Sequence, residues 1–111
     1  MLNYKTLGSG YLHTTASTHY LAPANIKGVI INATIANTHS SNAVTAQVHV
    51  IATGASDTSS NIVIPPRTIS AYEAYKCPEL IGKGVEATGT IRAVASSTST
   101  LTFHIYGYEV T

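Results

Sequence analysis

The closing stretch of the chain, Ala87–Thr111 (ATGTIRAVASSTSTLTFHIYGYEVT), decides the fold. It reads as two β-strands, Thr88–Ala95 and Leu101–Val110, joined by the small polar loop Ser96–Thr100. In both strands alternate side chains are apolar, and a period of two places them on one face of each strand. A hairpin with one apolar face is not stable alone, so it needs a second layer. The side chains expected to point inward are Ile91, Ala93, Ala95, Leu101, Phe103 and Ile105.

Two further strands are clear from the same alternation. In Lys27–Asn37 the residues Val29, Ile31, Ala33 and Ile35 share one face. In Ala43–Thr53 the inward set is Val44, Ala46, Val48 and Val50. Shorter and weaker strands are expected at Tyr4–Leu7, Tyr11–Thr15, Thr18–Leu21, Asn61–Ile64, Thr68–Tyr75 and Pro78–Ile81.

Turn signals separate these strands at regular intervals. Ala22-Pro23-Ala24-Asn25 has the composition of a turn, and Pro65-Pro66 is expected to end the strand before it, because proline cannot donate to a ladder. No segment has helical periodicity. About eight short antiparallel strands with this spacing predict an all-β sandwich, either immunoglobulin-like or jelly-roll-like.

At 111 residues the chain is long enough for one core and too short for two. Residues 1–10 carry little pattern and two glycines, so we expect an extended N-terminal arm. Residues 11–111 are expected to form the single β-sandwich domain.

The composition excludes several classes of function. Charged residues make up only 10% of the chain, the net charge is +1, and no basic run occurs, which disfavours nucleic-acid binding. No stretch has the length and apolarity of a signal peptide or a membrane span. Cys77 is the only cysteine, so neither an internal disulfide nor a cysteine-rich zinc site can form. A surface poor in charge suits a protein that packs against other proteins, although Thr-rich strands alone would also explain it.

Few residues of the chain are arranged for catalysis or metal binding. His49 and His104 lie on the polar faces of their strands and would be neighbours if those strands paired, but the five acids offer no third metal ligand at a suitable spacing. Cys77 has no nearby base and is expected to be buried and inert. The chain has no nucleophile-elbow, phosphate-loop or zinc-protease motif. We therefore expect no catalytic residues, no cofactor, no metal and no enzymatic activity.

Seven tyrosines are the most suggestive residues. Tyrosine offers a large contact area with a polar tip and is enriched at protein interfaces, although it is also an ordinary strand former. Tyr106 and Tyr108 share the outward face with His104 if Phe103 and Ile105 point inward. The candidate partner-contact residues are Tyr4, Tyr72, Tyr75, His104, Tyr106 and Tyr108.

The order of segments resembles a known group of proteins. A Pro-containing turn leads into an apolar strand (LAPANIKGVI), an Asn-Thr-Ser loop follows (IANTHSSNAV), then a Pro-bounded strand (NIVIPPRTISAYEAY) and the closing GTIRAVAS and TFHIYGYEVT strands. This succession is similar to the small β-sandwich structural proteins of tailed-bacteriophage virions. The resemblance implies many copies, packed against one another and against capsid, neck or tail proteins, with capsid decoration favoured, and assembly in the host cytoplasm. The arm of residues 1–10 would then be placed to pair with a neighbour's sheet edge.

Two other classes of function stay open. A receptor- or carbohydrate-binding module would use Tyr72, Tyr75, Tyr106 and Tyr108 as stacking platforms, although tryptophan is absent from the chain. A small hydrolase or metal protein would have only His49 and His104 to draw on.

Overall fold

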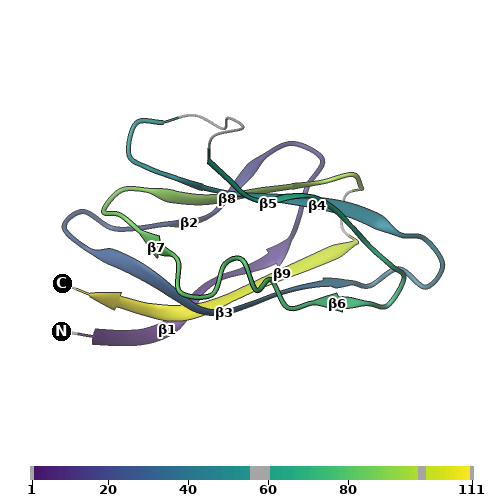
Figure 1. Cartoon of the computed structure of the whole chain (residues 1–111), viewed down its shortest axis with the longest axis horizontal. Helices are drawn as coiled ribbons and strands as arrows, with labels where there is room; N and C mark the ends of the chain where they lie inside the picture. Colours follow the sequence, from purple (N-terminus) through teal and green to yellow (C-terminus); the bar gives the residue numbers. More distant parts are fainter. Residues whose placement is uncertain (1, 56–60, 98–99, 111) are drawn as a thin grey trace.

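The computed structural model describes residues 2–55, 61–97 and 100–110, which form a two-layer antiparallel β-sandwich (Figure 1). Sheet A has five strands in the order β1-β9-β3-β6, with β7 also paired to β3, and sheet B has four in the order β2-β8-β4-β5. The predicted sandwich is thus confirmed. None of the described segments forms an apolar helix of membrane-spanning length. The strands are β1 (Leu2–Tyr11), β2 (Ser17–Leu21), β3 (Lys27–Asn37), β4 (Val44–Ile51), β5 (Ile62–Ile69), β6 (Ala74–Tyr75), β7 (Gly84–Val85), β8 (Thr90–Ala95) and β9 (Leu101–Val110).

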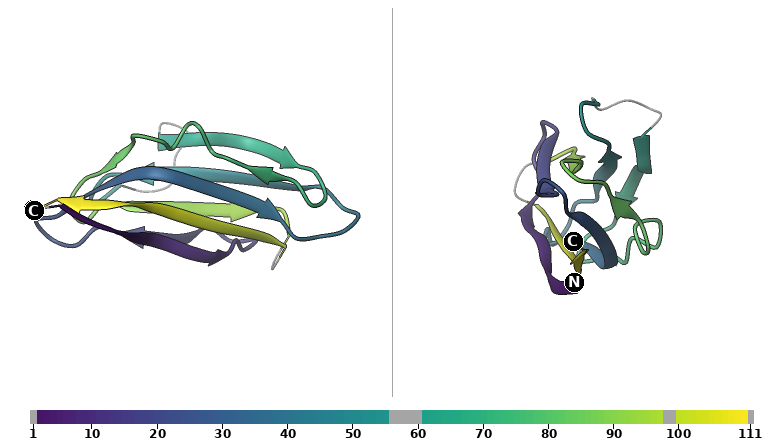
Figure 2. Two further views of the ribbon diagram at one scale, coloured as in Figure 1. Left: turned by 90° about the horizontal axis from the view of Figure 1, so that it is seen from below. Right: turned by 90° about the vertical axis from the view of Figure 1, so that its left-hand side faces the viewer.

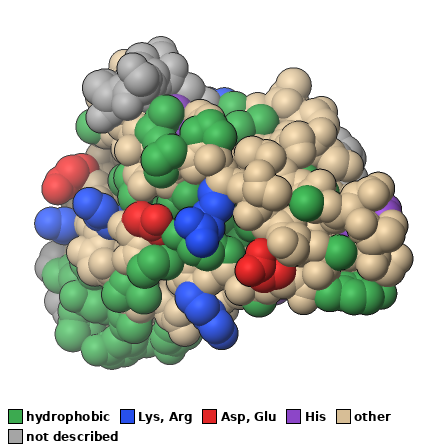
Figure 3. Space-filling view, turned by 45° about the vertical axis from the view of Figure 1, so that its right-hand side comes forward, with side chains coloured by type: hydrophobic (Ala, Val, Ile, Leu, Met, Phe, Trp, Pro, Cys, Tyr) green, Lys and Arg blue, Asp and Glu red, His purple; other side chains and the backbone are tan. Residues whose placement is uncertain are grey.

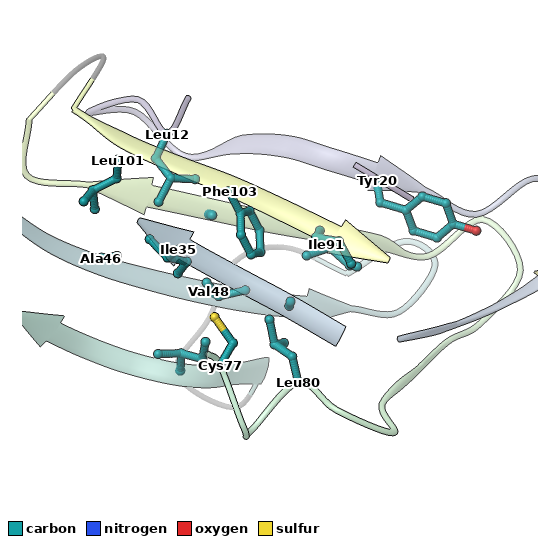
Figure 4. Close-up of a cluster of buried hydrophobic side chains, with 14 of the residues drawn as sticks. Leu12, Tyr20, Ile35, Ala46, Val48, Cys77, Leu80, Ile91, Leu101 and Phe103 are labelled. Carbon is teal, nitrogen blue, oxygen red and sulfur yellow. The ribbon is translucent and has the colours of Figure 1, made fainter. Parts of the chain in front are cut away.

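The core lies between the two sheets and is built from the inward side chains of both (Figure 4). Phe103, the only phenylalanine of the chain, is fully buried near its centre. All six side chains predicted to point inward from the closing stretch are buried. In β4 the prediction also holds, since Val44, Ala46 and Val48 are buried and Val50 packs against the core. Alternation therefore identifies the inner faces wherever a strand is regular.

The prediction that the last two strands form a hairpin is wrong. The strand β8 lies in sheet B between β2 and β4, whereas β9 lies in sheet A between β1 and β3. The connection between them crosses from one layer to the other; residues 98 and 99 within it are outside the described part. Such a connection between two sheets is called an arch. Strands joined by an arch and strands joined by a hairpin show the same alternation of apolar and polar residues, because in both cases each strand turns one apolar face toward the core. Periodicity alone could not tell them apart.

The N-terminal segment is also different from the expected arm. Residues 2–11 form one continuous strand that pairs antiparallel with β9 of the same chain, from Leu2 opposite Val110 to Tyr11 opposite Thr102. Leu7 is buried in the core. The segment belongs to the sandwich domain as the edge strand of sheet A, and the free side of β1 has no partner strand among the described residues. Its weak pattern reflects an edge strand, which is exposed on most sides.

The alternation predicted for β3 is wrong in its first half. Ile30 is fully buried and Ile31 is 39% exposed, which reverses the expected phase. The register against β9 shifts between Ile30 and Asn32, so Ile31 is the extra residue of a β-bulge. Beyond the bulge Ala33 and Ile35 share one face as predicted, and this face is buried together with Ile30.

Four weaker strand predictions need correction. The strand β5 continues through Pro65-Pro66, which sheet B tolerates because β5 is an edge strand and its register against β4 shifts at that point. The predicted strand Thr68–Tyr75 is not one strand: its first two residues end β5, and a turn in which the Glu73 amide donates to the Ser70 carbonyl separates them from β6. No strand forms at Pro78–Ile81, where the Leu80 amide closes a turn onto Cys77. Tyr11–Thr15 is the end of β1 followed by a loop.

Candidate contact surface on sheet A

The outer face of sheet A brings four of the six candidate contact residues together. The strands β1, β9 and β3 lie side by side on this face (Figure 2, left). Because Phe103 and Ile105 point into the core, their neighbours along β9 point outward. Tyr4 and Tyr108 are register partners, and Tyr106 and His104 follow along β9.

One end of this outer face is apolar and aromatic. Leu2 and Tyr4 are 52% and 57% exposed, and the ring centroids of Tyr4 and Tyr108 are 5.4 Å apart. Hydrophobic side chains gather at the lower left of Figure 3, at the end of the molecule where Figure 1 shows both termini. We call this surface the aromatic face and define it by Leu2, Tyr4, Val29, Tyr106, Tyr108 and Val110.

Apart from Lys27, the charged side chains at this end of the sheet are directed away from the aromatic face. Glu109 is buried and accepts a 2.8 Å hydrogen bond from the hydroxyl of Tyr20, which reaches across from sheet B. The Lys5 Nζ lies 3.6 Å from the other Glu109 oxygen. Burial and the hydrogen bond to Glu109 raise the pKa of Tyr20, so the phenol stays protonated as a donor. Among the described residues on the outer face of β1, β9 and β3, only Lys27 carries a formal charge, and it pairs with Glu86.

Next to the aromatic face lies a shallow hollow of about 130 Å³. Ala33 and Ile105 point their side chains inward, so their backbone forms the floor. Five outward side chains, all without formal charge when the histidine is neutral, surround it. They are Thr6, Asn32, Thr34, His104 and Tyr106.

Two β-bulges explain why the sheet is hollowed here. Against β9, the strand β1 gains one residue between Thr6 and Gly8, and β3 gains one between Ile30 and Asn32. Both extra residues lie beside the segment of β9 around Tyr106. Bulges bend a strand and increase its local twist, and they redirect side chains. The rim of the hollow is therefore set by backbone geometry.

The other two candidate residues lie elsewhere. Tyr72 is 73% exposed in the turn between β5 and β6 and has a positive φ of 57°. Tyr75 lies at the edge of the core; its hydroxyl donates to Glu79 at 2.5 Å, and the Arg67 guanidinium carbon lies 4.0 Å from its ring centroid. Burial and the bond to Glu79 raise the pKa of Tyr75 to about 12. The four tyrosines proposed as stacking platforms thus do not form one surface.

The histidines considered as metal ligands are also separated. His49 is in β4 of sheet B and His104 in β9 of sheet A, so their strands do not pair. The His49 ring is buried between the side chains of Gln47 and Asn61. Its Nε2 lies 2.8 Å from the Gln47 Nε2, and its Nδ1 lies 2.6 Å from the Asn61 Oδ1. Among residues 2–55, 61–97 and 100–110, no three His, Cys, Asp or Glu side chains gather closely enough to hold a metal ion.

Three residues of the hollow and three of the aromatic face, Leu2, Val29 and Val110, were not predicted from the sequence. Thr6, Asn32 and Thr34 are common strand residues, and nothing local to them marks a site. The apolar triplet Val29-Ile30-Ile31 differs from its neighbours, because in a regular strand successive side chains point to opposite faces, so three consecutive apolar side chains cannot all point into the core. That run indicates the bulge, and with it the place where the sheet is hollowed.

Comparison with known proteins adds no family to this description. No protein-family model matches the chain, and no curated protein sequence matches it significantly.

Proposed function

We propose that the protein is a non-enzymatic structural protein of a tailed-phage particle, present in many copies that pack against one another and against capsid, neck or tail proteins. Capsid decoration is the preferred position. The proposal rests on the resemblance of the segment order to small virion β-sandwich proteins. It places the protein in the virion after assembly in the host cytoplasm.

The observation that carries a packing role is the aromatic face. Exposed Leu2 and Tyr4, beside Tyr106 and Tyr108, present apolar area with hydroxyl tips and no carboxylate. Interface centres are enriched in aromatic residues and depleted in charged ones, because desolvating an ion is costly. Such a surface is suited to burial against another protein.

The state of Cys77 supports a role without catalysis. The side chain is fully buried, and burial is the main cause that raises the pKa of its thiol to about 12. The thiolate is the nucleophile in cysteine chemistry, and this thiol does not ionise near neutral pH. Cys77 is a core residue, as expected from the sequence.

The decisive experiment measures copy number in purified particles. Quantitative mass spectrometry of particles from an infected host should find the protein at a stoichiometry of many copies. Its absence from particles would refute the structural role.

A matched pair of variants tests the face itself. Tyr4→Lys places a charge on the aromatic face, and Leu21→Lys places the same charge on sheet B at a residue of similar exposure, 57% against 59%. We expect Tyr4→Lys to lower incorporation about tenfold or more, as for loss of an interface hot spot, and Leu21→Lys to leave it unchanged. Equal incorporation of both variants would contradict contact through this face.

A second candidate function, a receptor- or carbohydrate-binding module, is favoured by one specific observation. The hollow offers a ring, an amide and hydroxyls around one depression, which is the kind of lining that small polar ligands need. Binding of the purified protein to a glycan array would support it.

A further inference from the structure

The side chains around the hollow are free to bond to a ligand. Hydrogen bonds between described residues involve none of the five rim side chains, Thr6, Asn32, Thr34, His104 and Tyr106. By contrast, the buried His49 is held on both ring nitrogens and Asn37 bonds two backbone carbonyls. These two polar side chains are thus used structurally, while those of the hollow are not.

The chemistry of the rim selects a class of ligand. Hydroxyl and amide groups both donate and accept, and none of the described residues that line the hollow is an Asp, Glu, Lys or Arg. A ligand that carries several neutral hydroxyl groups matches such a rim better than an anion or a cation does. The ring of Tyr106, which is 46% exposed, adds an apolar surface at the side.

The dimensions limit the ligand to something small. The rows Thr6–Tyr106–Asn32 and Ser9–His104–Thr34 run across three neighbouring strands. Standard strand geometry makes the footprint between them about 7 Å by 10 Å. The hollow's volume of about 130 Å³ is well below the roughly 300–1,000 Å³ of pockets that enclose a drug-sized molecule. A single sugar ring fits this opening.

We propose that the hollow between the two bulges is a subsite for one ring of a neutral saccharide. Tyr106 packs against the face of the ring, and Asn32, Thr34 and His104 bond its hydroxyl groups. The bulges at Leu7 and Ile31 fix the rim before any ligand arrives, so binding needs no rearrangement of the sheet. The proposal rests on the second candidate function, and it stands or falls separately from a structural role in a particle.

The test uses amide chemical shifts of the isotope-labelled full chain. Glucose, galactose, mannose and N-acetylglucosamine are each titrated to about 50 mM, since so small a contact implies a dissociation constant in the millimolar range. We expect at least one sugar to give saturable shifts confined to residues 6, 32–34 and 104–106. Glycerol at the same concentration serves as the acyclic polyol control and should give no saturable shift.

Two matched variants test the role of the aromatic ring. Tyr106 and Tyr11 are both 46% exposed and both face outward from sheet A, but only Tyr106 lines the hollow. Tyr106→Ala should weaken the affinity about tenfold, and Tyr11→Ala should leave it unchanged. Dispersed spectra of both variants show that they are folded. The proposal is overturned if all four sugars fail to shift these amides, if the shifts fall elsewhere, if glycerol reproduces them, or if Tyr106→Ala binds as tightly as the parent.

The outcome is independent of the particle experiment. Loss of sugar binding with normal incorporation removes the subsite and keeps the structural role. Sugar binding by a protein that is absent from particles keeps the subsite and removes the structural role.

Discussion

Gly107 occupies the tightest position in sheet A. It lies opposite Lys5 on one side and Ile30 on the other, next to both bulges. A Cβ at this position would overlap the Val29 carbonyl oxygen, which belongs to the backbone and cannot rotate away as a side chain can. A glycine within a strand often marks a place where another backbone approaches closely. Here it allows β3 to approach β9 where the sheet bends.

Replacing this glycine should damage the fold. Gly107→Ala is expected to lower the free energy of unfolding by at least about 2 kcal/mol, because either the backbone or the pairing must shift. Gly84→Ala is the control, since the close contacts of its Cβ would be with the flexible end of Lys27, and its nearest backbone atom, the Gly28 oxygen, would lie at an ordinary contact distance of 3.8 Å. Urea denaturation measures both. Equal stability of the two variants would contradict the close approach.

The buried thiol makes stability fall in alkali. In the folded chain the pKa of Cys77 rises from 9.0 to about 12, mainly through burial. Above about pH 9 the unfolded chain loses this proton and the folded chain keeps it, so stability is lost as pH rises from about 9 toward 12. For one proton, the unfolding free energy can fall by at most about 1.4 kcal/mol per pH unit.

Urea unfolding at pH 8, 9 and 10 tests this dependence. Between pH 9 and 10 this thiol alone should cost the parent up to about 1 kcal/mol of unfolding free energy. Cys77→Ala should be less stable at every pH and should lose clearly less than the parent over this interval; its remaining loss comes from Tyr20 and Tyr75, whose pKa values are also raised by burial. If the unfolding free energy of the variant fell with pH as steeply as that of the parent, the pH dependence would belong to groups other than Cys77.

At the level of elements, β3 is divided in two by its bulge, and so is the surface that it helps to form. The segment before Ile31 carries Val29 of the aromatic face, and the segment after it carries Asn32 and Thr34 of the hollow. An extra residue in a strand reverses the side-chain alternation that follows. The bulge thus determines which of two adjacent isoleucines belongs to the core.

This pair of isoleucines gives a direct test. Ile30→Ala removes a fully buried side chain and should cost about 2–5 kcal/mol of unfolding free energy. Ile31→Ala truncates a side chain that is 39% exposed and should cost less than about 1 kcal/mol. Thermal or urea unfolding compares them. A larger loss at Ile31 would place the bulge elsewhere.

Regular strands could be predicted from the sequence, and irregular ones could not. The inward sets of β4, β8 and β9 follow from alternation, because burial of one face imposes a period of two. Alternation says nothing about which strand lies beside which. The arch between β8 and β9, the pairing of β1 with β9 and the separation of His49 from His104 all depend on long-range pairing. The aromatic face was predicted in part, through Tyr4, Tyr106 and Tyr108. Of the hollow, only His104 and Tyr106 were predicted as contact residues, because its shape depends on two bulges and on the register of three strands.

In the molecule as a whole, the two ends of the chain are neighbours. Leu2 and Val110 are partners at one end of sheet A, and both termini lie at the same end of the sandwich (Figure 1). Paired residues of antiparallel strands have Cα atoms about 5 Å apart. A short linker can therefore join the ends without moving either strand.

A circular permutant should fold for this reason. Joining the termini with a short Gly/Ser linker and opening the chain between Ala55 and Asn61, in the connection from β4 to β5, leaves every described strand intact. We expect the β-type circular dichroism spectrum and a cooperative thermal transition to be retained. A permutant opened between Asn32 and Ala33, within β3, should be unfolded. A folded second permutant would show that β3 does not need to be continuous.

The pairing of the two ends also bears on how the protein would be degraded. An exopeptidase that reaches sheet A from either direction along the chain first meets residues of the same pair, Leu2 and Val110. Their removal exposes the next pair, Asn3 and Glu109. Glu109 is bonded to Tyr20 of the opposite sheet, so trimming from either side is resisted by a contact between the two layers. The lifetime of the chain in a protease-rich environment should depend on how often this one corner opens.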